Sequence, residues 1–399
     1  MLKLLYFFMS DISEIFVRFS ELALKSPYVR HHMEKQLSLN IRLFLEKREI
    51  PNFHIEISRS WGRIILTQKI AEHKLLSFKE VDSVAQDIAY NVFGLTSVSP
   101  VIRVETNIDL IKKKVLEFAK KNLKKNSTFA VRVKRFGKHD FTSKDLEVLL
   151  GGEIYDKYSE QLNLKVDLTQ PDYLIMIEVK DNFTFVYDQK YIGFGGLPQG
   201  TQGLLVSILR GSLADAIAAF LMCKRGVITI PIIFSYSDEK NNISNKKELK
   251  KQLEYFALVQ PKQKPIFFEV NFTKILEKIG LDRIKCSTCD RVCLGIIERI
   301  IEGQNKKGVT LGNSDTTLLD WNPEMKLPNE NIPIYYPLIA LDQQTVKHPF
   351  HDDFKNSFCL DSCPGYINQQ NKEIKPLTDN EISELVASAD YNLITTGEF

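Results

Sequence analysis

The stretch FAVRVKRFGKHDFTSKDLEVLLGG, from Phe129 to Gly152, governs how the middle of this chain folds. Phe129, Val131 and Val133 fall on one face of an extended chain and Arg132 and Lys134 on the other, which predicts a β-strand with one buried face. Thr142 or Ser143 can then cap a helix, because a hydroxyl at that position accepts hydrogen bonds from free N–H groups of the first turn. The sequence therefore predicts a strand, a basic turn and a helix.

Basic residues gather in this turn and in the segment before it. Between Lys112 and His139 there are eleven lysines and arginines but one acid, Glu117, whereas the formal net charge of the whole chain is +3. This local excess favours binding of a phosphate backbone over a solvated helix face, and we expect the preceding lysines to extend the basic surface of the turn. The expected phosphate contacts of the strand and turn are Arg132, Lys134, Arg135, Lys138 and His139.

The same stretch resembles a known protein family. The run VRVKRFGKHDFTS, the pair Gly151 and Gly152, the strand YLIMIEV and the turn GFGGLPQGTQG are similar to the THUMP domain of the tRNA 4-thiouridine synthetase family. The resemblance implies a domain that binds tRNA. In active members of the family it also implies an enzyme that sulfurates a uridine near the tRNA elbow.

The segment before residue 80 has the pattern of a ferredoxin-like unit, with elements in the order β, α, β, β. Within it, the run VRFSELALKSPYVR resembles the N-terminal domain of the same family, which helps to hold the tRNA acceptor stem. Through this resemblance Arg18, Lys25 and Arg30 are predicted RNA contacts. The alternative is that each is an ordinary surface charge.

We predict three domains, an α+β part followed by an α/β part. They are a ferredoxin-like domain at 1–80, a THUMP domain at 81–195 and a third domain at 196–399. In the third, the apolar strands LLVSIL, VITIPIIF and PIFFEV alternate with helices, which predicts a doubly wound parallel sheet. The resemblance implies that this is the pyrophosphatase-loop domain of the family, related to the adenine nucleotide α-hydrolases.

The loop after the first of these strands departs from the family pattern. Family members have Ser-Gly-Gly-x-Asp-Ser, whose glycines let backbone N–H groups approach nucleotide phosphates at a helix N-terminus. This chain has RGSLAD, so one glycine remains and Ala214 replaces the carboxylate that would serve magnesium. Tyr336 also replaces a family arginine. We therefore predict a weak or lost site for ATP and magnesium; its lining residues would be Arg210, Gly211, Ser212 and Asp215.

Five of the six cysteines lie in the last third of the chain. The segment Cys286-x-x-Cys289 resembles that of archaeal-type members, in which three thiolates hold an iron–sulfur cluster. The spacing alone would suit zinc equally well, and a redox dithiol or buried thiols are further alternatives. Cys293 adds a candidate one helical turn later. The predicted metal ligands are Cys286, Cys289, Cys359 and Cys363.

Three hypotheses for function follow. The first is a tRNA-binding family member that acts in tRNA thiolation as a subunit, a chaperone or an altered enzyme, with an impaired ATP site. The second is an active ATP-dependent tRNA sulfurtransferase, in which adenylation of the uridine oxygen makes a leaving group for cluster-bound hydrosulfide. The third is a general RNA-binding protein with a structural zinc.

The expected partners follow from the same reasoning. They are tRNA, a sulfur donor or partner protein, and, by analogy with relatives, a second copy of the chain. No rhodanese-like segment follows the third domain, so sulfur is expected from outside the chain. The apolar run MLKLLYFFMS is too short to span a bilayer, and cysteine usage suggests reduced thiols, so we expect a cytoplasmic protein without a membrane segment.

Overall fold

The computed structural model divides into two compact units. The first consists of Met1–Leu24, Glu49–Tyr90 and Leu95–Gly193, and the second of Lys25–Arg48, Asn91–Gly94 and Phe194–Phe399. Within these ranges the structure describes residues 12–19, 21–50, 53–58, 62–69, 75–238, 243–261, 266–280, 285–302, 308–313, 332–339, 341 and 377–395. Among them, no helix combines the length and apolarity that crossing a bilayer requires.

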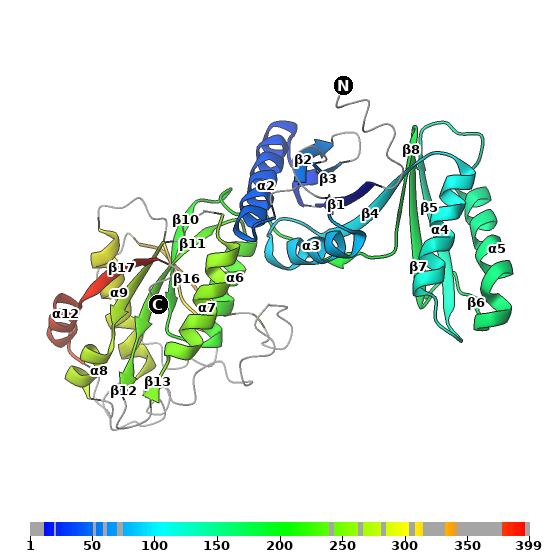
Figure 1. Cartoon of the computed structure of the whole chain (residues 1–399). Helices are drawn as coiled ribbons and strands as arrows, with labels where there is room; N and C mark the ends of the chain where they lie inside the picture. Colours follow the sequence, from blue (N-terminus) through cyan, green and yellow to red (C-terminus); the bar gives the residue numbers. More distant parts are fainter. Residues whose placement is uncertain are drawn as a thin grey trace. The chain divides into compact units, whose positions relative to one another are not determined.

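The first unit is built on a nine-stranded sheet (Figure 1). Its strands, in spatial order, are β2 (Phe53–Ser58), β3 (Arg63–Gln68), β1 (Ile12–Arg18), β4 (Ser97–Glu105), β8 (Phe183–Tyr187), β7 (Tyr173–Lys180), β5 (Thr128–Phe136) and β6 (Lys165–Val166), with β9 (Tyr191–Ile192) paired to β4. Strand β4 pairs antiparallel with both β1 and β8. The ferredoxin-like and THUMP segments therefore share one sheet, and the boundary between them at residue 80 stays a prediction.

The helices of this unit are a short 3-10 helix η1 (Glu21–Leu24), α3 (Phe78–Asn91), α4 (Ile108–Asn122) and α5 (Ser143–Leu162). Thr142 caps α5, because its side chain accepts a hydrogen bond from Asp145 N at 3.1 Å while Asp145 accepts one from Thr142 N at 2.9 Å. Helices α4 and α5 pack on one face of β5 and β7, around Val131, Leu150 and Ile177. The predicted strand, turn and helix are confirmed.

A buried ion cluster joins the two halves of this sheet. Glu178 of β7 is 1% exposed, and its carboxylate lies 3.3 Å from Arg18 Nη2 of β1 and 2.9 Å from Arg63 Nη1 of β3. The hydroxyl of Tyr187 donates to the same carboxylate at 2.8 Å. Burial alone would raise the pKa of Glu178, but Arg63, Tyr187 and Arg18 lower it below its usual value.

The second unit contains a six-stranded sheet with helices on both faces. The strand order is β16 (Ile334–Tyr335), β15 (Val309–Thr310), β10 (Leu204–Leu209), β11 (Ile228–Ser235), β14 (Ile266–Asn271) and β17 (Tyr391–Thr395). The pairs are parallel except that β17 runs antiparallel to β14. A separate hairpin is formed by β12 (Ser237–Asp238) and β13 (Ile243–Ser244).

Two apolar cores cover the faces of this sheet. Helices α6 (Leu213–Lys224) and α7 (Lys246–Val259) pack on one face. Helices α8 (Thr273–Ile279), α9 (Cys286–Ile301) and α12 (Asp379–Ala387) pack on the other. A parallel sheet buried on both faces needs the continuous apolar strands that the sequence showed. The predicted doubly wound fold is confirmed.

Helix α2 (Pro27–Lys47) belongs to the second unit by its contacts. Asn40 Nδ2 donates to Gln199 O at 3.0 Å, in the turn that leads into β10. Lys47 Nζ donates to Ala257 O at 2.6 Å and to Gln260 O at 2.5 Å, where α7 ends. Burial lowers the pKa of Lys47 to about 8. These bonds attach α2 to the parallel-sheet unit at its middle and at its C-terminal end.

We expect the Glu178→Ala substitution to destabilise the first unit by about 3–5 kcal/mol, because it leaves two guanidinium groups buried without a counter-charge. Urea unfolding followed by circular dichroism measures this loss. The contribution of Glu178 should be complete above the pKa of an unfolded glutamate, about 4.3, and should disappear as the pH falls through the lower folded-state value.

The matched control is Glu105→Ala, which removes an exposed carboxylate from β4 of the same sheet. We expect a change within about 0.5 kcal/mol for this control. An equal effect of the two substitutions would contradict a special role for the Glu178 cluster.

Candidate functional site

The basic turn between β5 and α5 is held by its own side chains. Arg135 Nη1 donates to Gly137 O at 3.0 Å, and Gly137 has a positive φ of 87°, which a glycine adopts without strain. His139 Nε2 lies 3.0 Å from Phe136 O, and its ring stacks on Phe141 with centroids 5.5 Å apart. Arg135 and His139 therefore shape the turn as well as adding charge to it.

Two lysines of this region point outward. Lys134 and Lys138 are exposed, and Phe136 between them is 44% exposed. Arg132 is half-buried and its guanidinium donates to Leu168 O, which ties β5 to the segment after β6. Phe136 was not among the predicted contacts. The sequence could have identified Phe136, because the strand alternation places it on the same face as Arg132 and Lys134 and opposite the core.

The lysines of α4 extend this surface less than the sequence predicted. Lys112 forms an ion pair with Glu153 of α5, and Lys114 forms one with Glu117. Lys124 and Lys125 lie between the end of α4 and the start of β5, whereas the turn follows the other end of β5. At about 3.3 Å per residue, the nine residues of β5 separate them from the turn by roughly 25–30 Å.

The three N-terminal candidates differ in what surrounds them. The guanidinium of Arg18 is bound by Glu178, by Tyr187 and by Ser99, and its side chain is 19% exposed. Arg30 Nε donates to Glu34 Oε1 at 2.7 Å. Lys25 is exposed and forms no ion pair with any residue that the structure describes. Of the three, Lys25 therefore has its charge available to a phosphate, and all three RNA contacts stay predictions.

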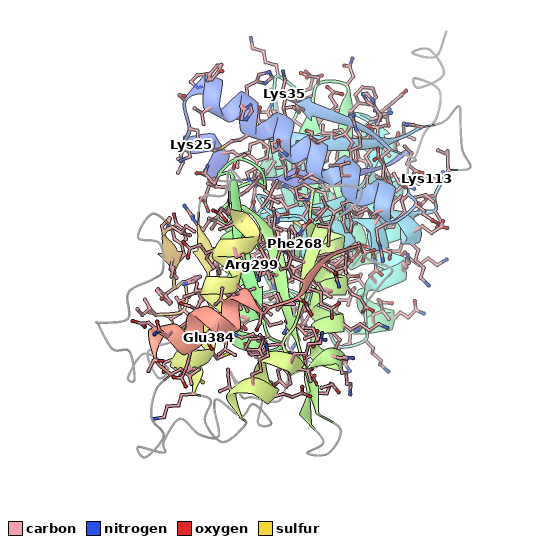
Figure 2. All side chains as sticks on the ribbon, turned by 90° about the vertical axis from the view of Figure 1, so that its left-hand side faces the viewer. Lys25, Lys35, Lys113, Phe268, Arg299 and Glu384 are labelled. Atoms are coloured by element: carbon pink, nitrogen blue, oxygen red, sulfur yellow. The ribbon has the colours of Figure 1, made fainter. Side chains whose placement is uncertain are left out.

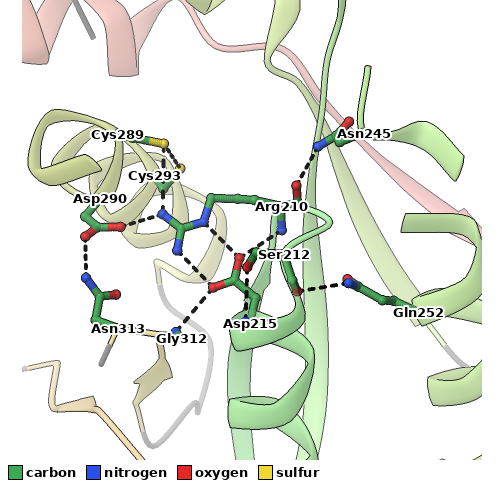
Figure 3. A network of polar contacts seen from close by, with 10 residues as sticks. All are labelled: Arg210, Ser212, Asp215, Asn245, Gln252, Cys289, Asp290, Cys293, Gly312 and Asn313. Atoms are coloured by element: carbon green, nitrogen blue, oxygen red, sulfur yellow. Dashed lines mark hydrogen bonds and ion pairs between the residues drawn. The ribbon is translucent and has the colours of Figure 1, made fainter. Parts of the chain in front are cut away.

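Arg210 begins the loop that follows β10, and its hydrogen bonds to Asp215 connect the two ends of that loop (Figure 3). Its backbone N and its Nε both donate to Asp215 Oδ2, at 3.2 and 2.9 Å, and its Nη2 donates to Asp215 Oδ1 at 2.9 Å. Ser212 caps α6, since its hydroxyl accepts a hydrogen bond from Asp215 N at 3.1 Å. The carboxylate of Asp215 is therefore folded back against the loop, and this residue is 1% exposed.

The network continues into other elements of the unit (Figure 3). Arg210 Nη1 donates to Asp290 Oδ1 of α9 at 2.5 Å, and Asn313 Nδ2 donates to Asp290 Oδ2 at 2.7 Å. Asn245, which precedes α7, donates to Arg210 O at 2.8 Å. Burial on its own would lower the pKa of Arg210, but Asp215 and Asp290 raise it well above the usual value. Arg210 thus remains charged and links β10, α6 and α9.

Three backbone amides of this region are already used within the protein. The backbone amides of Arg210 and Gly312 donate to the carboxylate of Asp215, and the amide of Asp215 donates to Ser212. A phosphate would have to displace a buried carboxylate that carries charge of the same sign. Gly312 also lies so close to α6 that a Cβ there would overlap Ala214 and Asp215.

The cysteines of α9 lie beside this loop. Cys289 Sγ is 3.9 Å from Arg210 Nη1 and 4.0 Å from Cys293 Sγ, one helical turn further on. The hydrogen bond from Cys293 and the charge of Arg210 lower the pKa of the Cys289 thiol, although burial opposes this. Burial raises the pKa of Cys293, which is fully buried.

The predicted metal site is described only in part. Cys286 and Cys289 lie at the start of α9 and are partly buried, while Cys359 and Cys363 fall outside the described residues. In the described part of the chain, no three His, Cys, Asp or Glu side chains are grouped to hold a metal ion. A closed zinc site takes four ligands, so Cys286 and Cys289 would need ligands from other segments.

Three family models match successive parts of the chain. They are the ThiI ferredoxin-like domain over residues 14–99, the THUMP domain over 105–188 and the thiamine biosynthesis protein (ThiI) over 200–349. The probable tRNA sulfurtransferase of Methanosarcina mazei is 31% identical over 343 residues, which cover 84% of this chain and 81% of the relative. The chain belongs to the tRNA sulfurtransferase (ThiI) family. The probable tRNA sulfurtransferase of Methanocaldococcus jannaschii is 30% identical, covering 84% of this chain and 86% of the relative.

Solved structures agree with this assignment. A crystal structure from Pyrococcus horikoshii is 28% identical with a TM-score of 0.59, and the match covers 84% of this chain and 96% of that one. The crystal structure of a 4-thiouridine synthetase–RNA complex with bound ATP has the same fold, with a TM-score of 0.63 at 20% identity, covering 96% of this chain and all of that one. The domain order of the tRNA sulfurtransferase family is therefore present along the chain.

Within this tRNA sulfurtransferase-family chain, the closed loop and the first cysteines share one domain. Arg210, Asp215, Cys286 and Cys289 lie inside the segment that matches the ThiI model, whereas Cys363 lies beyond its end. Tyr336, the predicted replacement of a family arginine, is half-buried; burial and the neighbouring Asp290 raise its pKa. Of the altered positions, Arg210 bonds to Asp290, and Tyr336 lies near enough for Asp290 to affect its pKa.

We expect Arg210→Met to destabilise the second unit by about 3–5 kcal/mol, since Asp215 and Asp290 would lose their counter-charge in a buried place. The urea midpoint of the transition that reports on this unit measures the effect. Lys250→Met, which removes an exposed lysine from α7, is the control and should change stability by less than about 0.5 kcal/mol. Unchanged stability of Arg210→Met would instead mean that the guanidinium is available to a ligand.

Proposed function

We propose that this protein binds tRNA and acts in tRNA thiolation, with a nucleotide loop that its own side chains close. Membership of the tRNA sulfurtransferase family supports the reaction, because the archaeal relatives carry that name. The observation that carries the RNA assignment is the outward-facing set Lys134, Phe136 and Lys138 at the end of β5. A polyanion with accessible bases matches exposed ammonium groups around an aromatic ring.

The roles of the turn residues differ in this proposal. Lys134 and Lys138 contact phosphates, and Phe136 stacks on a base or a ribose. Arg135 and His139 hold the turn through their bonds to Gly137 O and Phe136 O, and contact RNA only at its edge. Phosphate contacts of this kind position the RNA and give little base selectivity. Recognition of tRNA then rests on its shape.

The nucleotide chemistry is where this chain departs from an ordinary family member. With Arg210 bound to Asp215 and Asp290, its positive charge is neutralised, and the amides of Arg210, Asp215 and Gly312 already have acceptors within the protein. The protein would then supply tRNA binding in thiolation as a subunit or chaperone. Activation of the uridine and the sulfur would come from partners, in the cytoplasm where tRNA is found; self-association is a further expectation.

The second candidate function is an active ATP-dependent tRNA sulfurtransferase. The proximity of Cys289 to Arg210 favours it, because thiols and the nucleotide loop would then serve one reaction centre. Cys286 and Cys289 would hold the sulfur-carrying group, for which an iron–sulfur cluster and zinc are the alternatives. This function requires the Arg210 network to open when ATP and tRNA are present.

We expect Lys134→Ala/Lys138→Ala to weaken tRNA binding and to reduce its salt dependence, because two phosphate contacts are lost. The slope of log K against log salt should fall in magnitude by roughly 1.4–1.8. Fluorescence anisotropy with labelled tRNA at several KCl concentrations measures both quantities. The control Lys124→Ala/Lys125→Ala removes the same charge at the other end of β5 and should change the slope less. Equal slopes for the two variants would argue against the turn as the binding site.

Isothermal titration calorimetry with ATP and magnesium, with and without tRNA, tests the closed loop. We expect no binding in the micromolar range, because the phosphate position is taken by Asp215. Micromolar affinity, or release of AMP or pyrophosphate in the presence of tRNA, would refute the closed loop and establish the second candidate function. The visible spectrum of anaerobically purified protein separates an iron–sulfur cluster from zinc.

A further inference from the structure

Residues 377–395, which we call the C-terminal segment, lie against helix α9. The segment contains α12 and β17, and the match to the ThiI model ends before it, at residue 349. Strand β17 pairs with β14, and α12 packs into the same apolar core as α9 (Figure 2, in which Arg299 of α9 and Glu384 of α12 are labelled). The family match therefore does not account for this segment.

Two arginines of α9 bond to the two ends of α12. At the start of α12, Arg291 Nη2 donates to the carboxylate of Asp379. At its end, Arg299 Nη1 donates to Val386 O at 2.8 Å and to Ala387 O at 3.1 Å. A cation is favourable at this end, because the last carbonyls of a helix lack partners within it and carry the negative end of its dipole.

The middle of the contact depends on Gly295, which lies between the two arginines on α9. Positions 291, 295 and 299 are four residues apart, so they fall on one stripe of the helix. A Cβ at Gly295 would lie 2.6 Å from Val386 Cγ2, and a larger residue would therefore push α12 away. Glycine weakens a helix interior, and the close approach of α12 gives a reason for its presence here.

The spacing of the arginines matches the length of α12. Arg291 and Arg299 are eight residues apart, about 12 Å along α9, and Asp379 and Ala387 are also eight residues apart on α12. Because Arg291 bonds to the start of α12 and Arg299 to its end, the two helices run in the same direction. Helix α12 therefore lies along this part of α9 and is held at both ends.

The part of α9 that is held in this way adjoins the closed loop. Cys289 and Asp290 immediately precede Arg291, and Asp290 accepts a hydrogen bond from Arg210 at 2.5 Å. Successive residues of a helix point about 100° apart, so the start of α9 bonds to the loop through Asp290 and to α12 through Arg291. A shift of α9 away from α12 would move Cys289 and Asp290 as well.

We propose that the C-terminal segment positions the start of α9, and that Arg291 and Arg299 are positioning residues for Cys289 and Asp290. The inference rests on the proposed function only in taking the loop and its cysteines as the place of the chemistry. Closure of the loop by Arg210 then depends on a helix 88 residues further along the chain than Arg291. The second candidate function requires this loop to open, and the C-terminal segment is the element that restrains the opening.

The rate at which iodoacetamide alkylates Cys289 tests this positioning. The full chain is reduced, freed of metal with a chelator and alkylated at one pH under native conditions, and mass spectrometry distinguishes its cysteines. We expect Arg291→Met/Arg299→Met to raise the rate at Cys289 by roughly 10- to 100-fold, because charged hydrogen bonds that oppose local opening are lost. The rate at Cys223, which is fully buried in the core on the other face of the sheet, should not change.

A second pair of variants tests the same contact without changing any charge. Gly295→Ala places a methyl group against Val386 and should also raise the rate at Cys289. Gly295→Ala/Val386→Ala should restore the original rate, because the remaining Cβ of residue 386 lies 3.7 Å from the added methyl carbon, an ordinary contact distance.

The matched control is Lys274→Ala, which removes an exposed ion pair with Asp390 of the same segment. It should change the rate at Cys289 by less than about fivefold. An unchanged rate in both the double-arginine variant and Gly295→Ala would overturn the inference. An equal rise at Cys289 and Cys223 would overturn it too, because the substitutions would then unfold the whole unit. No RNA or nucleotide enters these assays, so the tRNA titrations test the proposed function separately.

Discussion

A single guanidinium group, that of Arg210, links three elements of the parallel-sheet unit, namely β10, α6 and α9. It lies at the carboxyl end of β10, where open α/β sheets bind their ligands, and it is held between Asp215 and Asp290. Both carboxylates are largely buried, so removing the guanidinium would leave each without its buried partner. The ion pairs therefore hold β10, α6 and α9 together at the end of the sheet where the proposed nucleotide loop lies.

The proposed RNA binding depends on a different constraint, which is how many basic side chains are paired with acidic ones. Several cations that look available in the sequence are neutralised by neighbours, as Arg18 is by Glu178 and Lys112 is by Glu153. Among the described cations that are exposed and form no described ion pair are Lys134 and Lys138 at the turn and Lys25 before α2. The turn combines these cations with the exposed ring of Phe136.

The α2 helix illustrates how sequence order and spatial grouping can differ. In sequence it belongs to the ferredoxin-like segment, which the family model matches from residue 14 to residue 99. In space its bonds through Asn40 and Lys47 attach it to the unit that contains the closed loop. A helix of the ferredoxin-like segment and the loop with its cysteines therefore belong to one compact unit.

The sequence by itself determined the elements and the family. Alternation from Phe129 to Val133 and the capping box at Thr142 are local properties, and continuous apolar strands specify a parallel sheet because both faces are buried. The absence of the second glycine after β10 was equally visible. Only the tertiary structure decided which side chains hold the loop after β10, because Asp290 and Gly312 are 80 and 97 residues from the partners they meet there. The same holds for the basic side chains. Whether each is paired with an acidic group depends on which side chains the fold brings beside it, and the order of the sequence does not show this.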